Sequence, residues 1–402
     1  MASQFTKPNL SKLFLKKFYV CVYKKLSMNQ SREFDIIIWG ASGFTGRLVA
    51  LYLFDKYGTS GELKWAMGGR DLAKLEKVRD EVADKNVPLI IANSNDKVSL
   101  LKMANKAKVI CTTVGPYAKY GSNLVEACVK SHIHYCDLAG EVQWMHKMIN
   151  HHHEEAKVNG SKIVHACGFD SIPSDMGVYF IQKEAKAKKG IIAQKIKMRV
   201  AAISGGVSGG TYASLSQVLA EARKDKVVYK ILTNPYALNP INEQFGKDKS
   251  DLKSIIFDKA SQSWIGPFIM ASVNTRVVRR SNFLSSYAYG KRFRYDEATI
   301  FGKGFFGRIK GTLSAISIGL IMSARHGTLF RKGLDMLFPI PGEGPTKKKR
   351  EKGFYNLRFY ITLEDGSNAF AKVTGDMDPG YGSSSKMLAE SAVCLAKDKL
   401  SN

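Results

Sequence analysis

Three glycines in the stretch "DIIIWGASGFTG" follow an apolar run and stand three residues apart, at Gly40, Gly43 and Gly46. After a strand, one glycine permits a sharp turn, the next lets the backbone approach a phosphate, and the third lets a helix pack closely. The N-terminus of that helix offers amide N–H groups to an anion. The pattern therefore predicts a dinucleotide-binding loop, with a structural turn as the alternative. Its residues are Gly40, Ala41, Ser42, Gly43, Phe44, Thr45 and Gly46.

Arg70 bears on which dinucleotide this loop would bind. It follows the second predicted strand in "WAMGGRD", where an NAD enzyme usually carries an acidic residue for the ribose 2′-hydroxyl. A guanidinium would pair instead with a 2′-phosphate. The sequence therefore predicts a preference for NADP(H) over NAD(H). Asp71 is predicted to cap the next helix.

A second turn, "TTVGPYAKYG", follows the fourth predicted strand, at the edge where ligands bind in this architecture. Val114, Gly115 and Pro116 are predicted to back the nicotinamide ring. Tyr117 and Asp137 are candidate catalytic residues, because a phenol or carboxyl at a strand end can hold a proton near substrate. Other candidates at strand ends are Tyr120, Tyr135, Glu141, Asp170 and Asp175. For each acid the alternative is a helix cap or a loop hydrogen bond.

The elements that must position these residues are strands and helices that alternate between residues 35 and 166. Apolar runs such as "KVICTTVG" lack polar alternation, which predicts strands buried on both faces. Runs with helical spacing of apolar residues separate them. Six strand candidates with intervening helices predict an α/β fold, a Rossmann-type doubly wound parallel sheet.

The pattern changes after the segment "CGFDSIPSDMG". The runs "KIKMRVAAI", "FYNLRFYITL" and "NAFAKVTGD" alternate as strands with one exposed face, which predicts a second α+β domain with a mainly antiparallel sheet. We therefore expect a basic N-terminal extension (1–32), a Rossmann domain (33–168) and a second domain (169–378). The final helix, within about 379–402, is predicted to return to the Rossmann domain.

The composition is strongly basic, with 61 Lys and Arg, 35 Asp and Glu, and a formal net charge of +26. Such a surplus favours anionic partners, with a functionless excess of lysine as the alternative. Residues 1–27 are basic and free of acidic residues, which is typical of a mitochondrial presequence or an interfacial anchor. The charge is scattered and forms no recognition module, so nucleic-acid binding is not expected.

A charge-free run at 311–324 raises the question of membrane contact. It is shorter than the roughly 20 residues of a membrane span, so we expect either a buried core helix or a segment that enters one leaflet. Upstream, residues 276–310 interleave basic and aromatic side chains, which suits a membrane interface or a solvated face over a core.

The six cysteines form no CxxC pair, and several stand in apolar runs, which predicts buried, reduced thiols in an intracellular protein. The stretch "HHHEE" at 151–155 has polar surroundings and is predicted to be a solvated helix face, because adjacent helical residues do not converge on one ion. No metal site is therefore expected.

Six motifs occur in one order along the chain: "GASGFTGRL", "GGR", "TTVGPYAKYGSNLVEAC", "HYCDLAGE", "CGFDSIPSD" and "GDMDPGYGSSSKMLAESA". Together they resemble the saccharopine dehydrogenase-like oxidoreductases, a family related to the trans-acting enoyl reductases of mycobacterial lipid synthesis. The resemblance covers most of residues 34–400. It implies a Rossmann domain, a second α/β domain and a nicotinamide cofactor, and for some members an association with lipid droplets or mitochondria.

The leading hypothesis is an NADP(H)-dependent oxidoreductase acting on an apolar or lipid-like substrate at or near a membrane. One alternative is a true saccharopine dehydrogenase of lysine metabolism, which would need cationic clamps; the basic residues near 276–294 are candidates. Another is a non-catalytic nucleotide-binding protein of a membrane or lipid droplet. The expected location is a mitochondrion, a lipid-droplet or membrane surface, or otherwise the cytoplasm, and a homodimer is one option for assembly.

Overall fold

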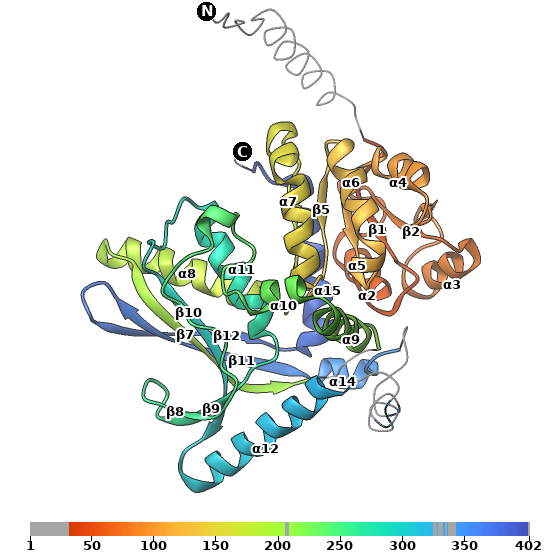
Figure 1. Ribbon diagram of the computed structural model, residues 1–402. Helices are drawn as coiled ribbons and strands as arrows, with labels where there is room; N and C mark the ends of the chain where they lie inside the picture. The colour runs from red at the N-terminus through yellow and green to blue at the C-terminus, as the bar shows by residue number, and fades with distance from the viewer. Residues whose placement is uncertain are drawn as a thin grey trace, which may run out of the picture.

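The computed structural model describes residues 32–205, 209–324 and 343–400, together with the isolated residues 328, 333 and 336. Two six-stranded sheets organise this part of the chain, and each has its own set of helices (Figure 1). The predicted presequence or anchor, residues 1–27, lies outside the described residues, as does Cys21.

The first sheet is parallel throughout and has the order β3-β2-β1-β4-β5-β6. Its strand order reverses between β1 and β4, so the ends of these two strands form the switch point where ligands bind in such sheets. The predicted Rossmann-type sheet is therefore confirmed. Its strands are β1 (Phe34–Trp39), β2 (Trp65–Gly69), β3 (Leu89–Ile91), β4 (Ala107–Thr112), β5 (His134–Cys136) and β6 (Ile163–Val164).

Helices cover both faces of this sheet because both faces of its strands are apolar. Ile37 and Trp39 belong to one buried cluster, and Ile36 and Ile38 belong to another on the opposite face, as the two-residue period of a strand requires. The helices of the first half are α2 (Phe44–Tyr57), α3 (Leu72–Val82), α4 (Lys97–Ala104), α5 (Tyr117–Tyr120), α6 (Ser122–Lys130) and α7 (Val142–Asn159).

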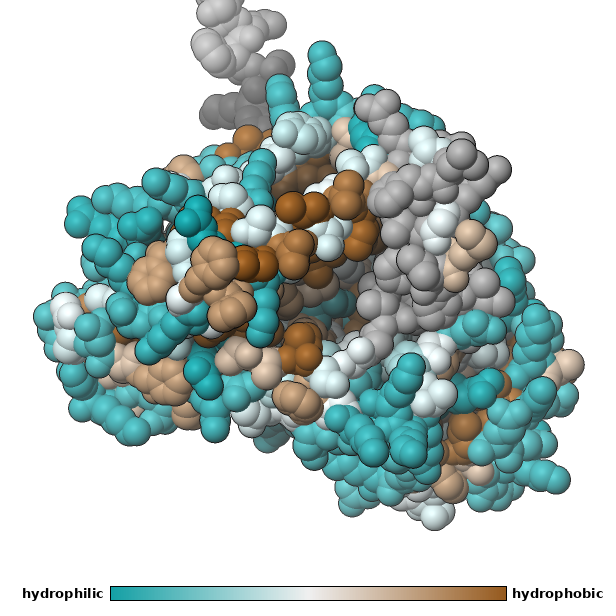
Figure 2. All heavy atoms as spheres, turned by 90° about the horizontal axis from the view of Figure 1, so that it is seen from below, coloured by the Kyte–Doolittle hydropathy of each residue, from teal (hydrophilic) through white to brown (hydrophobic). Residues whose placement is uncertain are grey.

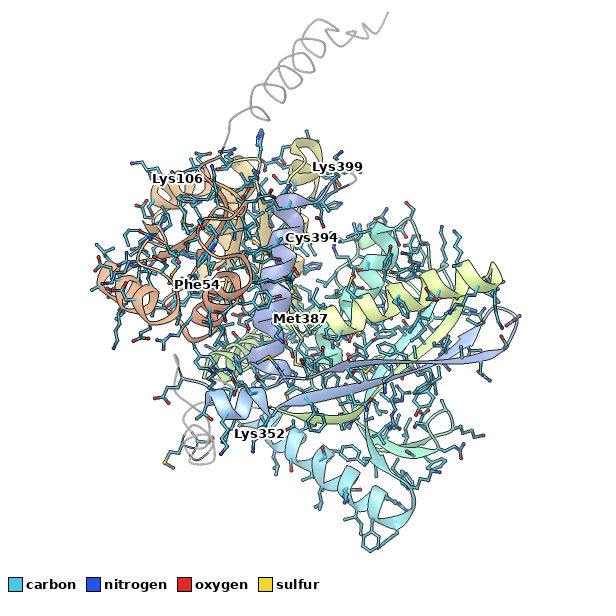
Figure 3. All side chains as sticks on the ribbon, turned by 180° about the vertical axis from the view of Figure 1, so that it is seen from behind. Phe54, Lys106, Lys352, Met387, Cys394 and Lys399 are labelled. Carbon is cyan, nitrogen blue, oxygen red and sulfur yellow. The ribbon has the colours of Figure 1, made fainter. Side chains whose placement is uncertain are left out.

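The last helix, α15 (Ser384–Lys397), returns to the first sheet, as predicted. It contacts α2, β1, β4 and β5, and Leu388 is fully buried in the same cluster as Ile36 and Ile38. Figure 3 shows α15 from behind, with Met387 and Cys394 labelled on it and Phe54 on α2. Lys56 on α2 also contacts Glu390 on α15 at 2.6 Å. The C-terminal segment thus completes one face of the first domain.

The second sheet has the order β12-β11-β7-β10-β9-β8. All its neighbouring pairs are antiparallel except β7 and β10, which are parallel, so the predicted mainly antiparallel sheet is confirmed. Its strands are β7 (Ala193–Ser204), β8 (Ile256–Asp258), β9 (Ser263–Gly266), β10 (Arg294–Gly302), β11 (Phe354–Leu363) and β12 (Asn368–Gly375).

One face of this sheet packs against α8 and α11, where Val178, Val278 and Phe359 share a buried cluster. The remaining elements connect or flank the sheet. The helices are α8 (Ile172–Lys189), α9 (Gly209–Lys224), α10 (Lys226–Thr233), α11 (Ala271–Leu284), α12 (Gly304–Ser323) and α14 (Lys347–Glu351), with short turns η1 (Ile241–Glu243) and η2 (Pro379–Ser383). The division of the chain at residue 168 stays a prediction; this residue lies between β6 and α8.

Helix α12 differs from the expectation for 311–324. It begins at Gly304, seven residues earlier, because the turn after β10 already directs the chain into a helix. Only Gly307 and Gly311 are buried within it, so the expectation of a core helix was wrong. Within the described residues this helix is the one that is long and apolar enough to cross a membrane.

Candidate functional site

The glycine loop joins β1 to α2, and two of its glycines are required by the protein's own packing. Gly40 has a φ of 90°, and a Cβ there would lie 2.6 Å from Cγ2 of Val114. A Cβ on Gly46 would lie 2.1 Å from the carbonyl oxygen of Gly40. Any larger residue at either position would push the helix or the neighbouring strand end away.

Gly43 is constrained differently. A Cβ there would meet only the carbonyl oxygen of Gly40, at 3.3 Å, and the residue is exposed. Gly43 caps α2 without any side-chain hydrogen bond, and the first turn of the helix has no acidic residue. The N-terminus of α2 therefore presents backbone donors and its positive dipole end at the surface of the loop, as an anion site requires.

The end of β4 lies next to this loop because β1 and β4 are hydrogen-bonded neighbours. The side chain of Val114 faces Gly40, and Thr113 donates a hydrogen bond through Oγ1 to the carbonyl oxygen of Gly40 at 3.3 Å. Gly115 and Pro116 continue from there, with Gly115 exposed. The structure thus brings the two predicted motifs to one place, although their role toward a nicotinamide ring stays a prediction.

A late segment of the chain packs against Phe44 of the loop, which the sequence did not indicate. The ring of Phe44 meets the ring of Tyr381 edge to face, with centroids 5.2 Å apart. The guanidinium of Arg350 lies 5.6 Å from the centroid of Phe44. Asp378 holds the turn that carries Tyr381, because its carboxylate accepts from the N–H groups of Tyr381 and Gly382 at 3.0 and 2.8 Å. The motif "GDMDPGYGSSS" therefore supports the glycine loop from the far end of the chain.

Arg70 follows β2 at the same edge of the sheet and is exposed. Asp71 caps α3 as predicted, accepting from the N–H of Lys74 at 3.1 Å. Arg70 forms no ion pair or hydrogen bond with any residue in the described ranges. Its guanidinium is therefore available to a ligand at this edge.

Tyr117 and Glu141 have internal partners. The hydroxyl of Tyr117 accepts from the N–H of Leu138 at 3.1 Å and donates to the carbonyl oxygen of Thr112 at 3.4 Å. Burial raises the pKa of this phenol well above its usual value, followed by the nearby Asp137 charge. Glu141 accepts from the N–H groups of Tyr117 and Ala118 at 2.7 and 2.8 Å. These contacts give both side chains a structural role, and a catalytic role for Tyr117 stays a prediction.

Asp137 is fully buried and fastens the ends of β5 and β6 together. Its Oδ1 accepts from the N–H groups of Ala139 and Ala166 at 2.9 and 3.0 Å. Its Oδ2 lies 2.7 Å from Nδ1 of His165, which has rings of Trp144 and Tyr135 packed against it. His165 was not predicted as a site residue from the sequence, although its position directly after β6, at the end of a strand, could have indicated it. A buried carboxylate that orients an imidazole is an arrangement that can hold or relay a proton.

Asp170 combines a raised pKa with the lack of an internal partner among the described residues. Burial and the neighbouring Asp137 raise its pKa to about 6, and among described residues it has no hydrogen-bond or ion-pair partner. The adjacent Phe169 ties both domains together, since its N–H donates to Oγ of Ser384 at 2.9 Å and its ring lies 4.9 Å from that of Tyr355. Asp170 therefore stands at the junction of the two domains.

The pKa of Asp175 is also raised, but this residue packs between helices of the second domain. Burial raises its pKa to about 7, and Ser281 on α11 donates to its Oδ2 at 2.8 Å. This partner holds the carboxyl between α8 and α11.

The candidate cationic clamps on α11 are occupied by protein groups. Arg276 pairs with Asp251, and Arg279 pairs with Asp248 at 2.6 Å. Arg280 donates to the carbonyl oxygen of Leu238 at 2.6 Å. These arginines fasten the connection between α10 and β8 onto α11. These internal partners disfavour a role for the three arginines in binding a dicarboxylic substrate.

Cys111, Cys128, Cys136 and Cys167 are buried free thiols, as predicted, whereas Cys394 is exposed on α15. "HHHEE" lies in the second half of α7. Within the described ranges no group of His, Cys, Asp and Glu is arranged to hold a metal ion.

Comparison with known proteins places this site in a family. A family model described as the saccharopine dehydrogenase NADP binding domain matches residues 36–164, the part that carries the glycine loop, Arg70 and Asp137. The chain is 37% identical over 386 residues to a Mycobacterium tuberculosis protein provisionally named a trans-acting enoyl reductase, covering 92% of this chain and 91% of the other. It is 33% identical over 393 residues to the trans-acting enoyl reductase of Mycobacterium ulcerans, covering 92% and 90%.

Among solved structures, the saccharopine dehydrogenase (L-Glu forming) of Saccharomyces cerevisiae matches with a TM-score of 0.48 at 12% identity, over 90% of this chain and 91% of that chain. This likeness carries no argument about chemistry. The family is shown instead by the sequence relationship to the mycobacterial proteins and by the matching domain model. The chain belongs to the saccharopine dehydrogenase-like family of NAD(P)-binding oxidoreductases, together with the trans-acting enoyl reductases.

Proposed function

We propose that this protein is an NADPH-dependent reductase of an apolar substrate with a polarised double bond, such as an enoyl thioester. The observation that carries the proposal is the N-terminus of α2 at Gly43, which no side chain caps, with the end of β4 packed beside the loop through Val114. The names of the mycobacterial relatives supply the reaction class, since they are trans-acting enoyl reductases.

NADPH is preferred over NADH in this proposal because of Arg70. Its exposed guanidinium has no protein partner in the described ranges and follows β2, where the adenosine ribose lies in Rossmann folds. No acidic residue stands at the end of this strand to bind a free 2′-hydroxyl, because the strand ends in Gly68 and Gly69.

The bound cofactor would supply a hydride to the β-carbon of the double bond, and the electron pair of that bond would move to the α-carbon, which then takes a proton. Asp170 is the proposed source of this proton. Its pKa of about 6 leaves it partly protonated near neutral pH, and no described residue competes for its proton. His165 and Asp137 form the hydrogen-bonded pair beside it, and burial, followed by the negative charge of Asp137, favours the protonated form of Asp170.

The internal partners of the α11 arginines favour an apolar substrate over saccharopine. A dicarboxylic amino acid needs free cations, but Arg276, Arg279 and Arg280 are bound to protein acceptors. A lipid-like acyl chain makes no such demand. The proposed setting near a membrane is consistent with this substrate class.

The direct test is a fluorescence titration of the full chain with NADPH and with NADH, followed by NADPH oxidation with medium-chain enoyl thioesters and with saccharopine as the comparison substrate. We expect tighter binding of NADPH and turnover of the enoyl thioester only. Lack of binding of either nucleotide at millimolar concentration would overturn the proposal, and turnover of saccharopine would replace the substrate class.

A further inference from the structure

We propose that α12 is a docking helix that lies in the plane of an anionic lipid surface. Its exposed side is apolar along the whole length of the helix. Phe305 and Phe306 at its start are 72% and 76% exposed, and Leu313 in its middle is 61% exposed. Figure 2 shows apolar side chains gathered on the face of the molecule seen from below, the side of α12 in Figure 1. The other large apolar residues exposed on α12 are Ile309, Ile316, Leu320 and Met322.

The opposite side of α12 is fixed to the second sheet. A Cβ on Gly307 would lie 2.4 Å from the carbonyl oxygen of Gly302, and one on Gly311 would lie 3.1 Å from Ile255 and Phe301. The guanidinium of Arg308 lies 5.4 Å from the ring centroid of Trp264 on β9. The two glycines let the helix lie directly on the strands, whereas Arg308 is exposed at the edge of this contact.

Both ends of α12 are fastened as well. Its start is joined to β10 through a single residue, Lys303, and its C-terminus is held by Arg223. The two terminal nitrogens of Arg223 donate to the carbonyl oxygens of Ala324 and Met322 at 2.8 and 2.5 Å. A helix tied at both ends and along one side cannot stand upright in a bilayer without leaving the domain. Although its length and composition suit a span, the contacts favour an in-plane position.

The positive charge of α12 and its flanking residues favours an anionic lipid surface as the partner of its exposed side. Residues 302–324 contain Lys303, Arg308 and Lys310 and no acidic residue. Each basic residue close to an anionic membrane surface adds a favourable contribution, and aromatic side chains are favoured at the depth of the head groups. Interfacial helices combine these features: an apolar face entering the acyl region and cations level with the phosphates.

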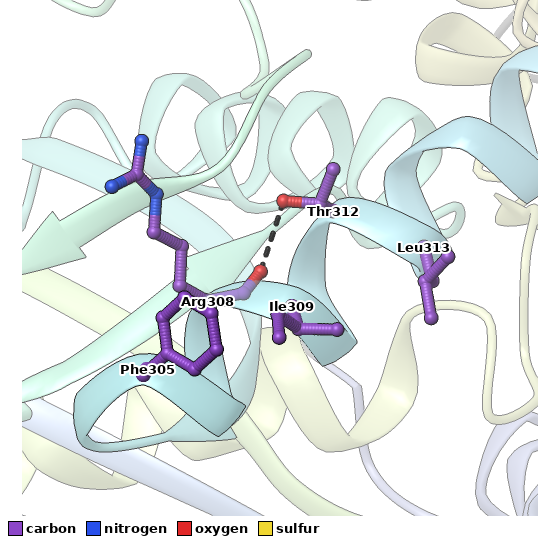
Figure 4. Close-up of a pocket in the computed structure, with 5 residues that line it drawn as sticks. All are labelled: Phe305, Arg308, Ile309, Thr312 and Leu313. Atoms are coloured by element: carbon purple, nitrogen blue, oxygen red, sulfur yellow. Dashed lines mark hydrogen bonds between the residues drawn. The ribbon is translucent and has the colours of Figure 1, made fainter.

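A shallow depression on α12 combines the same chemistry at close range. Phe305, Ile309 and Leu313 line it together with Arg308 and Thr312 (Figure 4). Thr312 donates through Oγ1 to the carbonyl oxygen of Arg308 at 2.9 Å, which satisfies its hydroxyl within the helix. One cation beside three apolar side chains suits the boundary between a lipid phosphate and its acyl chain.

The test is flotation of the full chain with vesicles of phosphatidylcholine alone and of phosphatidylcholine mixed with phosphatidylserine. We expect the protein to float with the mixed vesicles and to be partly released by high salt, because exposed charges are screened. Leu313→Asp should lower the vesicle partition coefficient about tenfold or more, because it replaces an apolar side chain that enters the lipid with a charge that anionic lipid repels. Val98→Asp on α4 is the matched control, because Val98 is also 61% exposed.

Equal flotation of Leu313→Asp and the native chain would overturn the proposal, and so would an equal loss for Val98→Asp. Bound protein that resists alkaline carbonate extraction would overturn the in-plane position in favour of a span. The docking is independent of the proposed reduction: an NADPH titration of the same samples separates failure of the cofactor site from failure of the docking helix.

Discussion

Two strand-to-helix turns in this protein are built alike, yet only one of them stands at the switch point of a parallel sheet, where ligands bind in such folds. The first is the loop from β1 to α2. The second leads from β10 to α12 through Gly302, Gly304 and Gly307. In each turn the last position must be glycine, because an added Cβ would come too close to the carbonyl oxygen of the first glycine. The distance would be 2.1 Å from Gly46 to Gly40 and 2.4 Å from Gly307 to Gly302.

The difference lies in the neighbours. The first turn opens at the edge of a parallel sheet, where the end of β4 packs against Gly40 and Arg70 follows on β2. The second turn follows β10, which has an antiparallel neighbour in β9, and leads into the exposed rings of Phe305 and Phe306. The second turn even has the commoner G-x-G-x-x-G spacing. Glycine spacing is therefore a weak signal until the sheet around it is known.

The largest expected effect comes from Gly46→Ala. Its Cβ would collide with the backbone of Gly40, which cannot move without disturbing Val114 and β4. We expect loss of NADPH binding together with a destabilisation of about 1–3 kcal/mol, measured by nucleotide titration and thermal unfolding.

Gly307→Ala is the matched change in the other turn. It should destabilise the second domain by a similar amount but leave NADPH affinity unaltered. Equal loss of nucleotide binding in both variants would break the distinction between the turns.

Asp170→Asn tests whether the proton donor of the proposed reduction is Asp170. Removing the acid should lower kcat by about 10²–10⁴-fold while NADPH affinity is retained. Because the raised pKa of Asp170 is about 6, the native enzyme should lose rate as the pH rises through that value, and the variant should lack this limb. Asp175→Asn, a change of the other aspartate with a raised pKa on this segment, should keep it. A native pH profile in Asp170→Asn would exclude Asp170 as the acid.

Arg70→Ala tests whether the first turn and the end of β2 distinguish NADPH from NADH. A charged hydrogen bond contributes about 1.5–3 kcal/mol, so the affinity for NADPH should fall roughly 10- to 100-fold while that for NADH stays the same. Parallel titrations with both nucleotides measure this, and an equal loss for both would show that Arg70 does not contact the 2′-phosphate.

The smallest effect is expected for Tyr117→Phe. It removes a hydroxyl that bonds to Leu138 and Thr112, which costs about 1 kcal/mol of stability, and kcat should remain near native. A fall in kcat of about 10²-fold without a matching loss of stability would instead support the catalytic role predicted from the sequence.

Much of the fold was predictable because its signals are local. Continuous apolar runs identified the buried strands of the first sheet, and alternation identified β7, β11 and β12 of the second. The loop of Gly40, Gly43 and Gly46 was found because strand, turn and helix are consecutive in the chain. The parallel pairing of β7 with β10 was not predicted, because it depends on contacts between distant segments.

The sequence by itself determined the glycine turn between β1 and α2 and the family, since backbone geometry at glycines and the order of motifs depend on consecutive residues. Only the tertiary structure decided which titratable groups meet. It paired Asp137 with His165, left Asp170 without a partner in the described chain, and gave the α11 arginines to internal carboxylates and carbonyl oxygens. It also turned the apolar side of α12 outward. The physical reason is that burial and pairing depend on neighbours brought together from distant parts of the chain.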